Sequence, residues 1–223
     1  MEKGLIITID GPAGAGKSTL AKALAKELGY KYLDTGAMYR AVALLALREG
    51  ISPEDDQGLK ELVDTVHLEV DDEGRIKANG QDLTEDLRDE KIGMMASLIS
   101  QKKDVREALW ALQRQIGAKG GIVAEGRDTG TVVFPQADVK FYLDASPEER
   151  ARRRFLDLLQ RGKAVSFEEV LEDVKRRDHQ DTNRSLAPLK VPEGAFYVDS
   201  TGLSISEVLG LMLEKVREKL RCR

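Results

Sequence analysis

The residues best suited to chemistry lie near the N-terminus, in a glycine-rich run that ends in Lys-Ser-Thr. The run fits the spacing G-x-x-x-x-G-K-[ST], in which glycines allow a tight turn whose backbone N–H groups reach phosphate oxygens. Lys17 can contact the β- and γ-phosphates of a nucleotide, and the Ser18 hydroxyl can ligate Mg²⁺. The predicted phosphate site consists of Gly11, Pro12, Ala13, Gly14, Ala15, Gly16, Lys17, Ser18 and Thr19.

The elements on either side have the form that such a loop needs. Residues 5–10 are mostly apolar and β-branched, which is typical of a buried parallel strand. Leu20, Leu24 and Leu28 recur at helical spacing after the loop. A glycine-rich turn that only links a strand to a helix is the alternative, but strand, spacing, Lys and Ser all favour phosphate binding.

Composition narrows the class of protein. The chain has 223 residues and is 41% hydrophobic, which suits one sizeable domain. Its only cysteine, Cys222, excludes an internal disulfide and favours a reducing cytoplasm. The net charge of −4 and the lack of a long apolar run argue against a nucleic acid polymer or a membrane as partner. Residues 1–4 lead directly into the first predicted strand, so we expect no signal peptide.

Basic residues nevertheless gather in the last third of the chain, which predicts an anionic ligand there. Arg150, Arg153 and Arg154 share one face of a predicted helix. If they lack acidic partners, a triphosphate arriving between them would explain the cluster. The gathered residues are Arg150, Arg152, Arg153, Arg154, Arg161, Lys163, Lys175, Arg176, Arg177 and Arg184.

Strands alternate with helices through most of the chain, which predicts an α/β fold with a parallel sheet covered on both faces. The further strands are expected at 31–33, 122–125, 139–143 and 196–199. Asp10, Asp34, Glu125 and Asp144 then stand at the carboxyl ends of strands, where open α/β sheets bind ligands.

Several other elements have local signatures. Residues 66–87 alternate around turn residues and predict a small antiparallel insert. Residues 89–116 predict helix with a break near 102–104, and Ser52 followed by Pro53 predicts the start of another helix. Further helices are expected to begin with capping boxes at Ser146 and Ser166, and with a capping serine at Ser204.

Three features point to a small anionic phosphate acceptor. They are Arg40 after a strand end, an exposed Arg127–Asp128 pair at another strand end, and Arg177, Asp181 and Arg184 on one helical face. For the last group, a solvated helix face with its own ion pairs remains an alternative. No N-K-x-D run is present, which disfavours a GTPase.

At these residues the chain resembles the bacterial-type cytidylate kinases, which are nucleoside monophosphate kinases of the P-loop superfamily. The resemblance extends over essentially the whole chain, and its most particular segment is EGRDTGTVVFP, residues 125–135. The other matching segments are IDGPAGAGKST (9–19), LDTGAMYR (33–40), VREAL (105–109), LDASPEER (143–150), and Arg177-Asp178 through Asn183-Arg184.

The resemblance implies a role for each site residue. Arg40, Arg127 and Arg184 would hold the acceptor phosphate, Arg177 and Asp181 would lie near phosphate and ribose, and Thr35 would line the pocket. Ser97, Arg106 and Asp128 would contact the base. The residues expected to act in transfer are Lys17, Arg127 and the lid arginines Arg150, Arg153 and Arg154; Mg²⁺ would be held by Ser18, with Asp34 or Glu125 through water.

The chemistry of the base agrees with this assignment. Cytosine has an N4 donor beside N3 and O2 acceptors, which complements one carboxylate and nearby Ser and Arg donors. Uracil would bring O4 toward the Asp128 carboxylate, and an unsatisfied buried pair costs about 1–3 kcal/mol. This difference corresponds to roughly tenfold to hundredfold discrimination.

The expected protein is therefore a monomeric kinase that transfers a phosphoryl group from MgATP to CMP and dCMP. Its core would comprise residues 1–35, 117–149 and 185–223, with a monophosphate-binding region at 36–116 and a lid at 150–163. Two alternatives stay open. One is a kinase of another acceptor such as UMP, AMP or shikimate, and the other is a nucleotide-dependent switch without acceptor turnover.

Overall fold

A five-stranded sheet forms the centre of the computed structural model, which describes residues 4–221 apart from the side chains at positions 88 and 90. Cys222 lies outside the described residues. All strands of the sheet run parallel, in the order β2-β6-β1-β7-β8. The predicted parallel α/β fold is confirmed. The strands are β1 (Ile6–Asp10), β2 (Lys31–Asp34), β6 (Ile122–Gly126), β7 (Val139–Asp144) and β8 (Phe196–Asp199).

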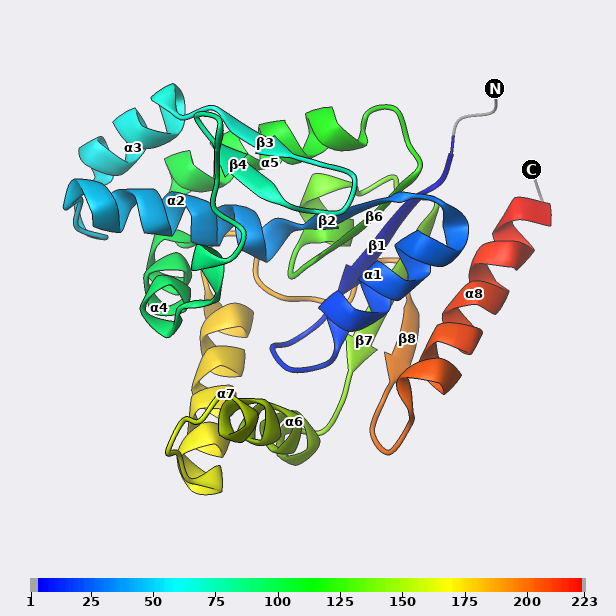
Figure 1. The fold of residues 1–223 in the computed structure, drawn as a ribbon. Helices are drawn as coiled ribbons and strands as arrows, with labels where there is room; N and C mark the ends of the chain where they lie inside the picture. Colours follow the sequence, from blue (N-terminus) through cyan, green and yellow to red (C-terminus); the bar gives the residue numbers. More distant parts are fainter. Residues whose placement is uncertain (1–3, 222–223) are drawn as a thin grey trace.

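Helices cover both faces of this sheet, and each face has its own apolar core (Figure 1). Residues of α1 and α8 pack on one face against β1 and β7, with Leu24, Phe141 and Met212 fully buried. Residues of α2, α4 and α5 form the larger core on the other face, in which Met38 and Ile99 are fully buried. The helices are α1 (Lys17–Leu28), α2 (Thr35–Glu49), α3 (Asp56–Thr65), α4 (Glu90–Ile99), α5 (Lys103–Gly117), α6 (Pro147–Gln160), α7 (Phe167–Asn183) and α8 (Ile205–Arg221).

The predicted antiparallel insert is present as a second, three-stranded sheet. It consists of β3 (Leu68–Val70), β4 (Ile76–Ala78) and β5 (Gln81–Asp82), followed by a 3-10 turn, η1 (Asp86–Arg88). Buried Leu68 and Ile76 join the core that α2 and α4 share. The insert therefore packs on the same core as α2 and α4.

Helices α6 and α7 project together below the sheet (Figure 1). They pack on each other through a separate small cluster around Ala151, Val170 and Val174, with Phe155 and Phe167 in an edge-to-face contact. Because this cluster is separate from the two main cores, the helix pair is joined to the sheet largely through polar contacts.

One predicted helix start and one predicted capping box need correction, whereas α6 itself begins at Pro147 as predicted. Helix α3 begins at Asp56 rather than after Ser52, because the Asp55 carboxylate accepts the hydrogen bond from Gly58 N (2.9 Å) while the Ser52 hydroxyl bonds to Glu54. At α6, Ser146 accepts from the backbone N of Glu149, but the Glu149 side chain turns to arginines instead of completing the capping box. The full box predicted at Ser166 is confirmed.

No helix within residues 4–221 is both long and apolar enough to cross a membrane.

Candidate active site

The glycine loop between β1 and α1 has positive φ at Gly11, Gly14 and Gly16, a conformation that favours glycine. Gly11 has a φ of 151°, and a Cβ there would lie 1.9 Å from the Leu143 carbonyl oxygen. Gly16 has a φ of 94° and precedes the first turn of α1, so the helix N-terminus opens directly beside the loop. This geometry presents backbone N–H groups and the positive end of a helix at one point, which suits a phosphate.

Lys17 is buried at the base of this loop, with its Nζ donating to the carbonyl oxygen of Pro12 (2.7 Å). Burial, and then the charge of Arg127, lower the pKa of Lys17, while the nearby acids Glu125 and Asp181 raise it. A buried ammonium next to an arginine is stabilised by an anion. The site therefore favours a phosphate group beside Lys17.

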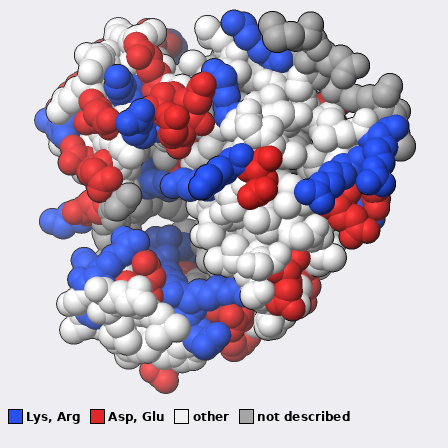
Figure 2. Space-filling view, turned by 45° about the vertical axis from the view of Figure 1, so that its right-hand side comes forward, with Lys and Arg blue, Asp and Glu red and all other residues white. Residues whose placement is uncertain are grey.

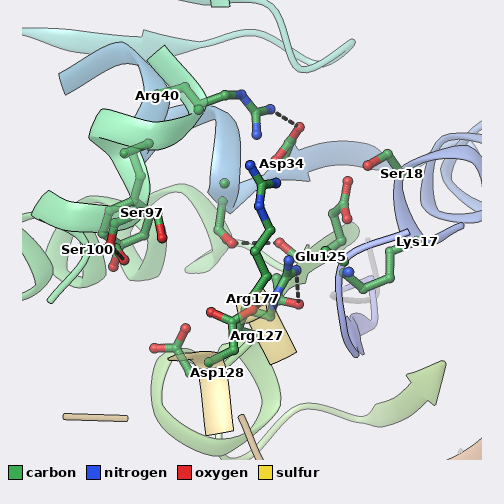
Figure 3. Close-up of a pocket in the computed structure, with 18 of the residues that line it drawn as sticks. Lys17, Ser18, Asp34, Arg40, Ser97, Ser100, Glu125, Arg127, Asp128 and Arg177 are labelled. Atoms are coloured by element: carbon green, nitrogen blue, oxygen red, sulfur yellow. Dashed lines mark hydrogen bonds and ion pairs between the residues drawn. The ribbon is translucent and has the colours of Figure 1, made fainter. Parts of the chain in front are cut away.

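Two carboxylates lie at the ends of β2 and β6: Glu125 beside Lys17 and Ser18, and Asp34 beside Arg40 (Figure 3). Glu125 is buried, and its Oε1 accepts a hydrogen bond from the Tyr32 hydroxyl (2.7 Å). Burial, and then the neighbouring Asp34, raise the pKa of Glu125. A hydroxyl and two repelling carboxylates form an oxygen donor set that suits Mg²⁺, which commonly keeps several waters and takes one or two protein carboxylates.

The arginines expected at the acceptor phosphate each face this same space, paired with acids. Arg40 Nη2 lies 2.9 Å from Asp34 Oδ2, and Arg127 Nε lies 2.7 Å from Asp181 Oδ2. Arg184 donates through Nε to the Ala187 carbonyl (2.6 Å), while its buried Nη2 makes no hydrogen bond among the described residues. An unsatisfied guanidinium nitrogen in a pocket wall is suited to an incoming anion.

The opposite end of the site contains the base-contact candidates. Asp128 is buried, so its predicted exposure was wrong: it accepts from Arg106 Nη2 (2.6 Å) and from Trp110 Nε1 (2.9 Å). Figure 3 places it on the side of Ser97 and Ser100, away from Lys17. Helix α5 brings Arg106 and Trp110 to this carboxylate because they are four residues apart on one face.

Asp10 fixes the segment that contains Asp128. Its two carboxylate oxygens accept from the backbone N of Thr129 (2.8 Å) and of Gly130 (2.6 Å), at the start of a π-helical turn, η2 (Thr129–Val133). The chain thus leaves β6 and turns sharply at a buried anchor. A side chain at Gly130 would meet Asp10 and Thr8 within about 3 Å, so the turn requires glycine for close approach.

One pocket of about 350 Å³ joins the phosphate end to the base end. A second, larger hollow of about 900 Å³ continues along Gly14 to Thr19 toward α6 and Ser200, and Figure 2 shows basic surface on both sides of a hollow between two lobes. Of the predicted site residues, the first pocket is lined by Ala13, Gly14, Lys17, Ser18, Asp34, Thr35, Arg40, Ser97, Arg106, Glu125, Arg127, Asp128, Arg154, Arg177, Asp181 and Arg184.

The arginines of α6 are not unpaired, which corrects the sequence-based expectation. Arg153 Nε lies 3.0 Å from Glu149, and Arg154 Nη2 lies 3.2 Å from Asp173. Both also line the larger hollow, whereas Arg150 is buried behind the loop. Glu149 pairs within α6, whereas Asp173 reaches Arg154 because α7 packs beside α6.

Gly11, Pro12 and Arg150 line neither pocket and support the loop from behind. Sequence reasoning also missed several residues that build the site. Tyr39 and Ser100 line the smaller pocket, and Trp110 and Asp178 hold site residues in place. Tyr39 and Asp178 lie within the segments quoted for the family resemblance, so the sequence could have indicated them. Trp110 bonds to Asp128, which is 18 residues away, and no local sequence pattern indicates that contact.

The fold and this two-ended pocket define a P-loop kinase of a small phosphorylated acceptor. The chain matches a gluconokinase structure from Sinorhizobium meliloti (TM-score 0.51, 15% identity, 98% of this chain and 96% of that chain). It also matches a shikimate kinase structure from Bacteroides thetaiotaomicron (TM-score 0.50, 13% identity, 96% and 98%). At these identities the likeness concerns the fold alone.

Sequence comparison gives the family. The family model "Cytidylate kinase" matches residues 7–218. The chain is 53% identical over 222 residues to a cytidylate kinase of Geobacter sp. (strain M21), covering 98% of this chain and 95% of that protein. The chain belongs to the cytidylate kinase family.

Proposed function

We propose that the protein transfers the γ-phosphoryl group of ATP to the phosphate of CMP, giving CDP and ADP. The observation that carries this proposal is the single pocket that joins the phosphate loop at Lys17 to the buried carboxylate of Asp128. One end suits a transferring phosphoryl group, and the other offers an acceptor to the N4 amino group of cytosine. Membership of the cytidylate kinase family supports the same acceptor.

The transfer needs little covalent chemistry from the protein. An oxygen of the CMP phosphate attacks the γ-phosphorus of ATP, the bond from that phosphorus to the β–γ bridging oxygen breaks, and ADP leaves with that electron pair. The attacking phosphate is already anionic, so no strong general base is required. Lys17, Arg127 and Arg154 line the pocket in which the transferring charge would lie, and their task is positioning and charge stabilisation.

For this transfer, substrate must replace the acidic residues that pair with the pocket arginines. Arg40 is paired with Asp34, and Arg127 with Asp181. We infer that the CMP phosphate takes over these guanidinium groups, which frees Asp34 for a metal-bound water and Asp181 for the ribose. The ion pairs with Asp34 and Asp181 neutralise the two arginines when no substrate is bound.

Mg²⁺ fits the donor set of Ser18, Asp34 and Glu125. When bound, it would supply positive charge that offsets the negative charge of the ATP phosphates. Ser18 would hold it directly, and the two carboxylates would contact its waters. Tyr32 orients Glu125 for this role through the hydrogen bond at 2.7 Å.

Initial rates of ADP release with CMP, UMP, AMP and shikimate test the acceptor. We expect CMP to be preferred, and a clear preference for AMP or shikimate would refute the proposal. CMP-dependent ADP release should be lost in Lys17→Ala and Arg184→Ala, while Lys219→Ala on the distal helix α8 serves as a control with unchanged rate. If wild-type protein turns over no monophosphate, a nucleotide-dependent switch becomes the better description.

We extend the proposal to dCMP, because the phosphate and base ends of the pocket do not involve the 2′-hydroxyl. We also propose that the protein acts as a monomer in the cytoplasm. Sedimentation at working concentrations tests the oligomeric state.

A further inference from the structure

The buried carboxylate of Asp128 is held in an unequal way. Both hydrogen bonds that it accepts from described side chains reach one oxygen, Oδ2: Arg106 Nη2 at 2.6 Å and Trp110 Nε1 at 2.9 Å. Oδ1 accepts none from residues 4–221 as described, and Arg184 Nη2 lies 3.6 Å from it. The two oxygens of this carboxylate therefore have different surroundings.

Trp110 reaches this carboxylate from outside the pocket. Its ring is half-buried on α5, and it is absent from the residues that line either pocket, whereas Asp128 and Arg106 line the smaller one. The Arg106 guanidinium lies 5.1 Å from the Trp110 ring centroid and 5.5 Å from that of Tyr39. The indole thus supports both members of the Arg106–Asp128 pair without a substrate contact of its own.

A single donor on a carboxylate oxygen leaves the group free to rotate about its χ2 torsion, which is a broad and soft coordinate. A second donor on the same oxygen, from a different direction, restricts that rotation. Arg106 alone is not sufficient, because its Nη1 is committed to the Ser100 carbonyl (2.7 Å) and only Nη2 bonds to the carboxylate.

We propose that Trp110 is a positioning residue for base selection: its indole N–H, with Arg106, occupies Asp128 Oδ2 and leaves Oδ1 facing the pocket as the acceptor for the base amino group. This inference rests on the proposed phosphorylation of CMP and deepens it. It explains why the only tryptophan of the chain stands behind the base end of the pocket.

The variant Trp110→Phe tests the role, because it removes the N–H donor and keeps an aromatic ring on α5. We expect kcat/KM for CMP to fall about tenfold, as for loss of one hydrogen bond to a charged group. The loss should appear mainly in KM for CMP, with kcat/KM for UMP and KM for ATP within about twofold of wild type. Equal losses with CMP and UMP, or an unchanged CMP to UMP ratio, would overturn the proposal.

Leu112→Ala is the matched control. Leu112 stands on the same helix, packs on the larger apolar core and carries no group that could donate a hydrogen bond to Asp128. If Trp110→Phe acted only by disturbing the packing of α5, both variants should lose thermal stability, and the CMP to UMP ratio of kcat/KM should stay unchanged in both. We expect the ratio to change in Trp110→Phe alone.

A double-mutant cycle separates action through Asp128 from any other route. In an Asp128→Ala background, Trp110→Phe should no longer alter the CMP to UMP ratio, because the carboxylate that the indole orients is gone. A tenfold further change in that background would show that Trp110 acts elsewhere and would overturn the proposal.

Should Trp110→Phe not fold, wild-type protein still provides a test. Because Trp110 is the only tryptophan, saturating CMP should change the tryptophan emission, and UMP should change it less. No change with CMP would overturn the inference. Failure of the proposed function looks different: wild-type protein would then not phosphorylate CMP at all.

Discussion

Arg150 on α6 and Asp178 on α7 face each other in a two-point ion pair, with Nη1–Oδ1 at 2.9 Å and Nη2–Oδ2 at 2.7 Å. The same guanidinium donates to the Ala13 carbonyl of the phosphate loop (3.2 Å) and to the Ala145 carbonyl (2.8 Å). One buried side chain therefore joins the donor loop, the end of β7 and the helix on which Arg177 and Asp181 stand.

Arg150→Ala should accordingly lower the free energy of unfolding much more than the same substitution at neighbouring positions of α6. Removing one partner of a buried ion pair typically costs about 3 kcal/mol, because the other charge is left without compensation. Urea unfolding measures the loss. Arg152→Ala is the matched control on the same helix: its exposed side chain pairs, among the described residues, with Glu149, and its loss should cost less than about 1 kcal/mol. Similar losses for the two variants would contradict a joining role for Arg150.

Asp128→Asn should change base preference in a particular direction. Arg106 and Trp110 both donate toward one oxygen, so the amide oxygen of Asn should take that place and its NH₂ should face the pocket. A donor then stands where an acceptor stood, which favours O4 of uracil over N4 of cytosine. We expect the CMP to UMP ratio of kcat/KM to fall at least about tenfold, with KM for ATP little changed. An unchanged ratio would contradict the base assignment of Asp128.

Asp10 should make stability depend on pH. Burial is the main cause that raises the pKa of Asp10 to about 6, although hydrogen bonds from Gly130 and Thr129 lower it. The folded state then binds more protons than the unfolded chain between pH 4 and 6, so this contribution to the free energy of unfolding is present at low pH and falls as pH rises through 6. The slope is at most about 1.4 kcal/mol per pH unit.

The comparison between wild type and Asp10→Asn isolates that contribution. The wild-type advantage should decrease from pH 4 to 6 and stay level above 7, as measured by urea unfolding at each pH. Thr8→Val, on the same strand and without a titrating group, should give a difference that does not vary with pH. A wild-type advantage that increases from pH 4 to 6 would show that the backbone hydrogen bonds outweigh burial.

Tyr32→Phe should raise the Mg²⁺ concentration needed for half-maximal rate. The variant removes the hydroxyl that donates to Glu125, so a carboxylate proposed to contact metal-bound water loses one of its fixed partners. The effect expected from one hydrogen bond to a charged group is about tenfold. Tyr30→Phe is the control, because the Tyr30 hydroxyl accepts from Leu5 N far from the loop. Equal Mg²⁺ dependence in both variants would argue against Glu125 as a ligand of that water.

The sequence allowed the sheet, the loop and most helices to be predicted, because apolar periodicity and capping residues act over short distances. Burial of Asp128 was not visible, since the turn that contains it depends on Asp10, which stands more than a hundred residues earlier in the chain. Asp173 likewise pairs with Arg154 only because α6 and α7 pack together. The types of residue along the chain were enough to predict which residues line the pocket. The partners that orient these side chains come from tertiary contacts, which the sequence did not reveal.

The small insert has a consequence for solubility. Strand β2 is one of the two edge strands of the main sheet, and its Tyr32 N donates to the Asp72 carbonyl (3.0 Å) in the turn between β3 and β4. Lys31 pairs with the Asp72 carboxylate at 2.6 Å, and Gly74 packs so closely on the Tyr32 ring that a Cβ would lie 2.4 Å from it. The turn shields an edge that another chain would otherwise extend, and so it protects against aggregation through strand pairing.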